Sequence, residues 1–240
     1  MQQPGFFDLM SFGPGGWGPA MLTGALVTLA LALCGFAIGA VFGAVAAFAK
    51  IAGGRIARTI ADIYTTVLRG IPDLLVIYLF YFGGSTVLTS IGRLFGHDGF
   101  IGLPGFATGA IAIGIVSGAQ HTEVFRGAFR AVHRGEIEAA IAAGMHPFLR
   151  FRRIIAPLVL RYALPGLGNI WQIVLKESAL VSVTGVVELL RQAQVGAGSE
   201  RQPFTFYFAA AILYLVITSL SSITFRQAEG YFSRGVRRSR

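Results

Sequence analysis

The chain has 240 residues, of which 54% are hydrophobic and only 13% are charged. A soluble domain usually carries about 25% charged residues. Several apolar runs here approach the roughly 20 residues that cross a bilayer. This composition excludes an ordinary soluble enzyme and predicts one all-α domain, a polytopic membrane helix bundle. The single cysteine, Cys34, excludes an intrachain disulfide.

Residues 1–20 are expected to form a lead-in on the outer side of the membrane. They contain no Lys or Arg, so the basic region that opens a cleavable signal peptide is missing. The segment is rich in Gly, Pro and aromatic residues, including Phe12 and Trp17. Trp favours the headgroup level of a bilayer, so an interfacial position is indicated.

The apolar runs predict about five membrane-spanning helices. A glycine series in the first, Gly35, Gly39 and Gly43, recurs every four residues and would permit close helix packing. Simple apolar filler explains the same series equally well. The predicted spans are Met21–Ala49, Thr59–Phe82, Gly105–Phe129, Leu158–Val186 and Phe204–Phe225.

The placement of basic residues predicts the orientation. Fifteen of the 20 Lys and Arg residues fall in three alternate segments, 50–58, 126–161 and 226–240, and only three fall in the opposite set. Basic residues concentrate in loops on the cytoplasmic side. We therefore expect the N-terminus outside and the C-terminus inside. The net charge of +9 is then explained by topology, and not by nucleic-acid binding.

Arg69 and Asp73 are charged residues inside the second predicted span. A mid-bilayer Arg costs about 2.5–3.5 kcal/mol on insertion scales, so Arg69 is expected to face protein or a polar path. Asp73 follows four residues later, which would place it on the same helix face. Pro72 lies between them and should kink the helix. An internal Arg69–Asp73 pair and a substrate-path element remain equal alternatives.

Two further acids lie in the predicted spans. Glu177 adjoins Lys176 in the fourth span, where it either pairs structurally or attracts a cationic substrate. Glu123 lies three residues before Arg126, and a structural ion pair is favoured there. The substrate-path candidates are Arg69, Asp73 and Glu177.

The inner segment 136–147 predicts a slim helix outside the bilayer. Ile137, Ile141 and Met145 follow at four-residue spacing and would share one face, between alanines. Such a helix fits a groove on a partner protein. A helix lying on the membrane surface is the equal alternative.

This loop resembles the coupling loop of ABC importer permeases. The resemblance rests on Glu138-Ala139-Ala140, then Gly144, then Ile154 and Pro157, although Ala156 stands where the family usually has Leu. It implies the type I importer (MetI-like) fold, with domain bounds of 21–226, a cytoplasmic coupling loop at 130–157 and a basic tail at 227–240. It also implies that the loop docks on an ATPase subunit.

Three more motifs resemble the polar amino acid uptake group of these permeases. They are Arg69-Gly70-Ile71-Pro72, Glu123-Val124-Phe125-Arg126-Gly127, and Arg161-Tyr162-Ala163-Leu164-Pro165-Gly166, the last resembling the histidine and opine branch. The resemblance implies a second permease subunit, two ATP-binding subunits and a periplasmic solute-binding protein. It places the chain in a bacterial inner membrane with the N-terminus in the periplasm.

No catalysis is expected within this chain. Its two lysines, Lys50 and Lys176, do not sit in a phosphate-binding loop, so ATP and Mg would be bound by partner subunits. The four histidines lack metal-ligand spacing. A stand-alone secondary transporter or channel is the alternative function, although no internal repeat supports it.

Overall fold

A computed structural model describes residues 5–97 and 99–232, and within these ranges the chain is helical with no strand. This confirms the all-α prediction. The α-helices are α1 (Phe6–Leu9), α2 (Gly18–Ala52), α3 (Arg55–Gly70), α4 (Asp73–Tyr78), α5 (Gly84–Leu94), α6 (Gly105–Arg130), α7 (Arg134–Ala142), α8 (Pro147–Arg150), α9 (Ala156–Glu177), α10 (Leu189–Glu200) and α11 (Pro203–Phe232). Two π-helical turns, η1 (Leu79–Gly83) and η2 (Phe151–Ile155), and a 3₁₀ segment, η3 (Ser178–Thr184), connect them.

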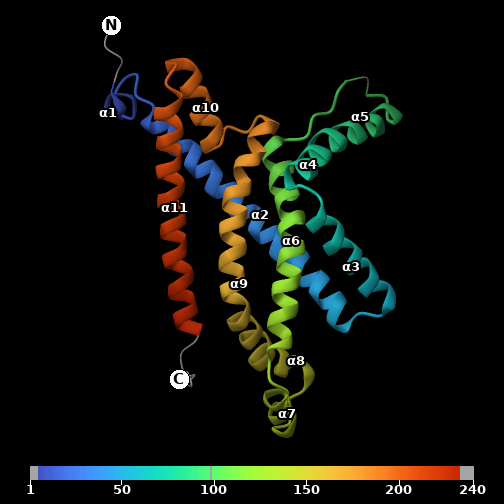
Figure 1. Ribbon diagram of the computed structural model, residues 1–240. Helices are drawn as coiled ribbons and strands as arrows, with labels where there is room; N and C mark the ends of the chain where they lie inside the picture. The colour runs from blue at the N-terminus through green and yellow to red at the C-terminus, as the bar shows by residue number, and fades with distance from the viewer. Residues whose placement is uncertain (1–4, 98, 233–240) are drawn as a thin grey trace.

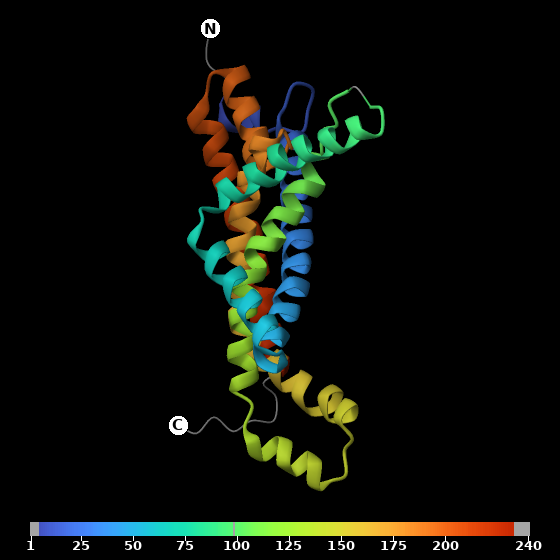
Figure 2. The same cartoon turned by 90° about the vertical axis from the view of Figure 1, so that its right-hand side faces the viewer.

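The long helices form an elongated bundle. In Figure 1, α6 and α9 run side by side through the middle, α11 flanks α9, and α2 crosses the bundle diagonally. The short helices α5 and α10 lie with the N-terminal segment at one end, and α7 and α8 project from the other (Figures 1 and 2). Helix α11 continues to Phe232, inside the predicted basic tail; residues 233–240 lie outside the described residues.

Four helices among the described residues are long and apolar enough to cross a membrane: 18–52, 73–94, 147–184 and 203–232. Helices 18–52, 147–184 and 203–232 confirm the first, fourth and fifth predicted spans. Helix α6 matches the predicted third span to within one residue, but it is not among these four. Much of α6 is buried by its neighbours instead, including Ala112, Ser117 and Ala119, so it needs less apolar surface of its own.

The predicted second span, 59–82, is wrong as one continuous helix. The backbone is extended at Ile71 and Pro72, which separates α3 from α4, and the apolar helix begins only at Asp73. Pro72 lacks the backbone N–H that a continuing helix would use. Helix α3 is itself amphipathic: one face exposes an apolar stripe, and the other carries charged and hydroxyl side chains. The stripe comprises Ile56, Ile60, Ile63 and Val67.

Glycines hold α2 directly against α6. A Cβ atom added at Gly39 would lie 2.2 Å from Ser117 Oγ, and one at Gly43 would lie 2.3 Å from His121 Cβ. The seam is reciprocal, because a Cβ added at Gly114 of α6 would lie 2.4 Å from Ile38 Cγ2. The four-residue glycine series is therefore a packing surface and not filler.

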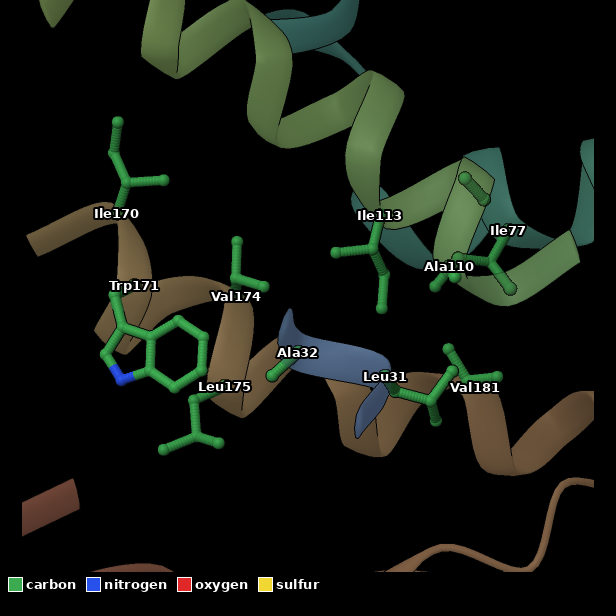
Figure 3. Close-up of a cluster of buried hydrophobic side chains, with 11 residues drawn as sticks. Leu31, Ala32, Ile77, Ala110, Ile113, Ile170, Trp171, Val174, Leu175 and Val181 are labelled. Atoms are coloured by element: carbon green, nitrogen blue, oxygen red, sulfur yellow. The ribbon is translucent and has the colours of Figure 1, made fainter. Parts of the chain in front are cut away.

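The main core lies where α2, α6 and α9 meet. Figure 3 shows Leu31 and Ala32 of α2 between Ile113 of α6 and the Val174–Leu175 face of α9. These side chains are at most 2% exposed. The core therefore fixes the crossing point from which α6 and α9 extend toward α7 and α8.

A buried carboxylate ties the opposite end together. Glu188 caps α10 by accepting hydrogen bonds from the backbone N–H groups of Leu190 and Arg191, at 2.8 and 2.7 Å. It also accepts from the hydroxyls of Thr28 and Tyr214, both at 3.2 Å. Burial raises the pKa of Glu188, while these hydrogen bonds oppose the rise. The carboxylate thus joins α2, α10 and α11.

The glycine seam makes a specific prediction. Gly39→Val should lower the thermal unfolding temperature of the detergent-purified protein, because the added methyl groups overpack the α2–α6 contact by roughly 1–3 kcal/mol. The matched control is Ala37→Val, on the exposed side of the same helix, which should change little. Equal unfolding temperatures for the two variants would contradict the seam.

Candidate functional site

The predicted coupling helix is shorter than its sequence pattern suggests. Helix α7 ends at Ala142, and the backbone N–H groups of Gly144 and Met145 donate to the carbonyl oxygens of Ile141 and Ala140, at 2.9 and 3.1 Å. Gly144 has φ of +74°, the left-handed conformation that favours glycine after a helix. The predicted helix over 136–147 is therefore wrong beyond Ala142. Met145 lies past the turn and does not extend the isoleucine stripe.

The motif residues assemble around one groove. Ala139 and Ala140 of α7 face Ile154 of η2 and Pro157 of α9 across a hollow of about 510 Å³, which we call the α7 groove. Its other lining residues are Glu136, Ala143, Met145, Arg153 and Leu158. Glu138 is exposed outside this lining. The small alanines leave the space that larger side chains would fill.

The loop reverses direction through a second cap. Pro147 opens α8, where its missing N–H costs no hydrogen bond. The Nδ1 atom of His146 accepts from the backbone N–H of Leu149 at 3.4 Å. His133 and His146 are both exposed. This cap brings η2 and α9 back along α7.

A polar cavity lies between α3, α4, α6 and α9, and we call it the central cavity. It measures about 480 Å³, and Arg69 and Asp73 both line it. The other lining residues are Leu68, Val116, Gln120, Glu123, Val124, Gly166, Asn169 and Ile170. Arg69 and Asn169 are exposed on the isolated chain, so the cavity opens to its surface.

Arg69 and Asp73 reach this cavity by a different route from the predicted one. The helix breaks between them at Ile71 and Pro72, so they do not share a helix face. No ion pair joins them within residues 5–97 and 99–232. The structure therefore favours two separate charges on one cavity over a self-neutralised pair.

Glu177 joins this site through Asp73. Glu177 is 9% exposed and does not line the cavity, and its Oε2 atom has no hydrogen-bond partner among the residues that the structure describes. Its carboxyl group interacts with that of Asp73. Two neighbouring carboxyl groups repel when both are ionised, and a cation between them relieves this repulsion.

A charged network lies farther along α6. Lys50 Nζ lies 2.9 Å from both Asp62 Oδ1 and Glu123 Oε1, and it donates to Thr65 Oγ1 at 2.7 Å. Arg126 pairs with Glu123, which confirms the predicted ion pair. Sequence reasoning counted Lys50 only as a loop charge, yet its side chain is 8% exposed.

Sequence reasoning also missed two uncharged members of the central cavity. Gln120 directly precedes His121, Thr122 and Glu123 in α6, whereas Asn169 stands in a mostly apolar stretch of α9. An isolated amide in a membrane helix is itself a signal, because such groups usually face protein or a polar cavity. Each amide supplies both donors and an acceptor to that cavity.

Known proteins are similar to this chain over nearly its whole length. Residues 39–237 match the family described as "Binding-protein-dependent transport system inner membrane component". The chain is 58% identical to the octopine transport system permease protein of Rhizobium meliloti, covering 98% of this chain and 99% of the relative. It is 46% identical to the nopaline transport system permease protein of Agrobacterium fabrum (95% and 98%). It is 40% identical to the histidine/lysine/arginine/ornithine permease protein of Salmonella typhimurium (93% and 98%).

Solved structures agree with this grouping. The crystal structure of an amino acid ABC transporter with histidines matches at a TM-score of 0.74 and 32% identity, covering 90% of this chain and 95% of that one. An inward-facing methionine ABC transporter matches in fold alone, with a TM-score of 0.65, 16% identity and coverage of 90% and 96%. The chain therefore belongs to the binding-protein-dependent transport system inner membrane component family, and it is a multi-pass permease component of an ABC importer in the inner membrane.

Proposed function

We propose that this permease imports a basic amino acid or an opine, an amino-acid derivative that retains a cationic group. The relatives named for octopine, nopaline and histidine/lysine/arginine/ornithine transport support this substrate class. The higher identity to the octopine permease favours octopine as the first substrate to test.

The observation that carries the proposal is the central cavity. It combines Arg69 with Asp73 and two amides among membrane-embedded helices. A guanidinium or ammonium group suits Asp73 and its neighbour Glu177, while Arg69 can hold a carboxylate. The charge pattern therefore complements a substrate that carries both a cation and a carboxylate.

The open cavity supports partner subunits. One chain lines it on one side and leaves Arg69 exposed, so a second permease subunit, identical or related, would close the path. Two ATP-binding subunits would bind ATP and Mg and drive the cycle, since this chain has no phosphate-binding loop. A periplasmic solute-binding protein would deliver the substrate.

The proposed orientation keeps the N-terminus in the periplasm and the C-terminus in the cytoplasm. The concentration of Lys and Arg in segments 50–58, 126–161 and 226–240 supports this orientation. In Figures 1 and 2, α7 and α8 project from the end opposite to α10, which agrees with a cytoplasmic α7. The lead-in residue Trp17 packs on Phe206 with ring centroids 5.3 Å apart, at the periplasmic end in this orientation.

Coupling would run through α7. The exposed Glu138 and Ile141 present a surface to the ATPase, and Gly144, Ile154 and Pro157 hold α7 against the start of α9. ATP binding would favour one packing of the bundle over another by binding that packing more tightly at α7. The substrate path would then open alternately to the two sides.

Reconstitution tests the function directly. The complex of this chain with its permease partner, ATPase and binding protein, placed in liposomes, should take up labelled octopine or arginine only with ATP. Uptake that persists without the ATPase subunits would contradict the proposal. So would ATP-dependent uptake confined to substrates without a cationic group.

The carboxyl pair should determine the cation preference. Asp73→Asn and Glu177→Gln should each lower kcat/KM for octopine about tenfold or more, because a hydrogen bond to a charged group is worth roughly 1.5–3 kcal/mol. Uptake kinetics in proteoliposomes measure this. Asp8→Asn, an exposed carboxylate remote from the cavity, is the control. Unchanged kinetics in both the Asp73→Asn and the Glu177→Gln variants would show that neither carboxyl group belongs to the substrate path.

The α7 turn should be required for ATPase docking. Gly144→Ala forces a side chain into left-handed backbone at a cost of roughly 1–2 kcal/mol, so less ATPase should co-purify with the permease. Gly135→Ala, in the first turn of the same helix with open space around it, is the matched control. It should leave docking intact, since alanine favours a helix. Equal ATPase recovery with both variants would contradict this role.

A further inference from the structure

Two more cavities continue from the central cavity along α3 and α6. A linking cavity of about 420 Å³ shares Arg69 and Glu123 with the central cavity. A basic cavity of about 500 Å³ shares Lys50 with the linking cavity. Along α6 the lining advances from Gln120 through Glu123 to Arg130. The three cavities therefore follow one another in a single lane toward the α2–α3 turn.

The lane lies on the polar side of α3. Arg58, Asp62 and Arg69 line it from that helix, whereas the stripe containing Ile56, Ile60 and Ile63 points elsewhere and is exposed. Side chains on a helix separate into faces by their 3.6-residue period. An apolar face meets lipid, so the lane faces away from the hydrocarbon.

The charge of the lane reverses along its length. The central cavity is lined by two acids, Asp73 and Glu123, and one cation, Arg69, and the carboxyl group of Glu177 interacts with that of Asp73. The basic cavity is lined by four cations and a single acid. Those residues are Lys50, Arg58, Arg126, Arg130 and Asp62, with Ile51 and Phe129 beside them. A cation is favoured beside Asp73 in the central cavity, and an anion is favoured in the basic cavity.

A salt bridge separates these two positions. Glu123 lines the central and linking cavities, and Lys50 lines the linking and basic cavities. Lys50 Nζ lies 2.9 Å from Glu123 Oε1, so this salt bridge lies between the central and basic cavities. Lys50 and Arg126 are neutralised by Glu123 and Asp62. In the part of the chain that the structure describes, Arg58 and Arg130 have no ion-pair partner, which leaves two exposed guanidinium groups for a ligand.

We propose that the basic cavity is a second substrate site, which binds the carboxylate end of the transported amino acid or opine after the Lys50–Glu123 contact opens. Arg58 and Arg130 are the residues that bind it, because a guanidinium group pairs with a carboxylate through two parallel hydrogen bonds. The site rests on the proposed import function and on its cytoplasmic direction. The basic cavity would give the substrate a favourable binding position after the substrate leaves Asp73 and Glu177.

The test compares uptake with ATP hydrolysis in the reconstituted full complex. The double variant Arg58→Gln with Arg130→Gln should lower octopine uptake per ATP hydrolysed by roughly tenfold. A tenfold change corresponds to about 1.4 kcal/mol of binding free energy lost at this site. ATP hydrolysis stimulated by octopine-loaded binding protein should stay unchanged, because neither residue lies on α7. The matched control is Arg55→Gln with Arg226→Gln, two exposed arginines outside the cavity with the same loss of charge. The control should transport as the wild type does.

The outcomes separate the possible explanations. An unchanged ratio of uptake to ATP hydrolysis in the Arg58/Arg130 variant would overturn the site. An equal loss of uptake in the Arg55/Arg226 control would also overturn it, as would a parallel fall of uptake and ATP hydrolysis. The assay is repeated in liposomes of phosphatidylcholine alone. A defect seen only with phosphatidylglycerol present would assign the cavity to a lipid headgroup and overturn the proposal. Absence of ATP-dependent uptake by the wild-type complex would overturn the proposed function and this site with it.

Discussion

The close contact between α2 and α6 is the constraint on which the rest of the structure depends. Gly39 and Gly43 let the α2 backbone lie against Ser117 and His121, leaving both α6 side chains fully buried. His121 still satisfies one ring nitrogen, because its Nδ1 atom lies 2.8 Å from the Ser117 carbonyl oxygen. With one side of α6 sealed in this way, its other side is free to carry polar residues at membrane depth.

That free side explains why α6 is both central and only moderately hydrophobic. Gln120, Glu123 and Arg126 would be costly against lipid, but here they face a cavity or an ion partner. The glycine seam supplies the packing that apolar side chains supply in the other long helices. A helix of this kind can line a polar path without losing its place in the membrane.

One continuous helical run connects the two candidate sites. Residues 147–184 include Ile154 and Pro157 at the α7 groove, and also Asn169 at the central cavity. Helix α7 packs against the start of this run, and α6 leads directly into α7. A displacement of α7 would therefore act on α6 and α9, two of the four helices that line the central cavity. The π-helical turn η2 near the groove, just before Pro157, is one irregular point in this run.

Much of this fold follows from sequence patterns, and the exceptions have physical causes. Long apolar runs predicted α2, α9 and α11. The glycine spacing fitted a packing face on α2 and apolar filler equally well, and it did not identify α6 as the partner. The second span was misplaced because Ile60, Ile63 and Val67 make α3 look apolar, although they form only one stripe of an amphipathic helix. The end of α7 was missed because Gly144 reads as a small helical residue until its backbone is seen. The lane could not be predicted, since Lys50 meets Glu123 only through tertiary packing.

The central claim is that the cavity between α3, α6 and α9 forms part of a water-accessible substrate path. Cys34 is the only cysteine, so Cys34→Ala gives a background without thiols. In that background, Asn169→Cys would be exposed to a charged, membrane-impermeant thiol reagent in the reconstituted complex, with Ile63→Cys on the exposed apolar stripe as its control. The account predicts that Asn169→Cys reacts, that octopine-loaded binding protein with ATP changes its rate, and that Ile63→Cys stays unlabelled. An unreactive Asn169→Cys, or equal labelling at both positions, would contradict it.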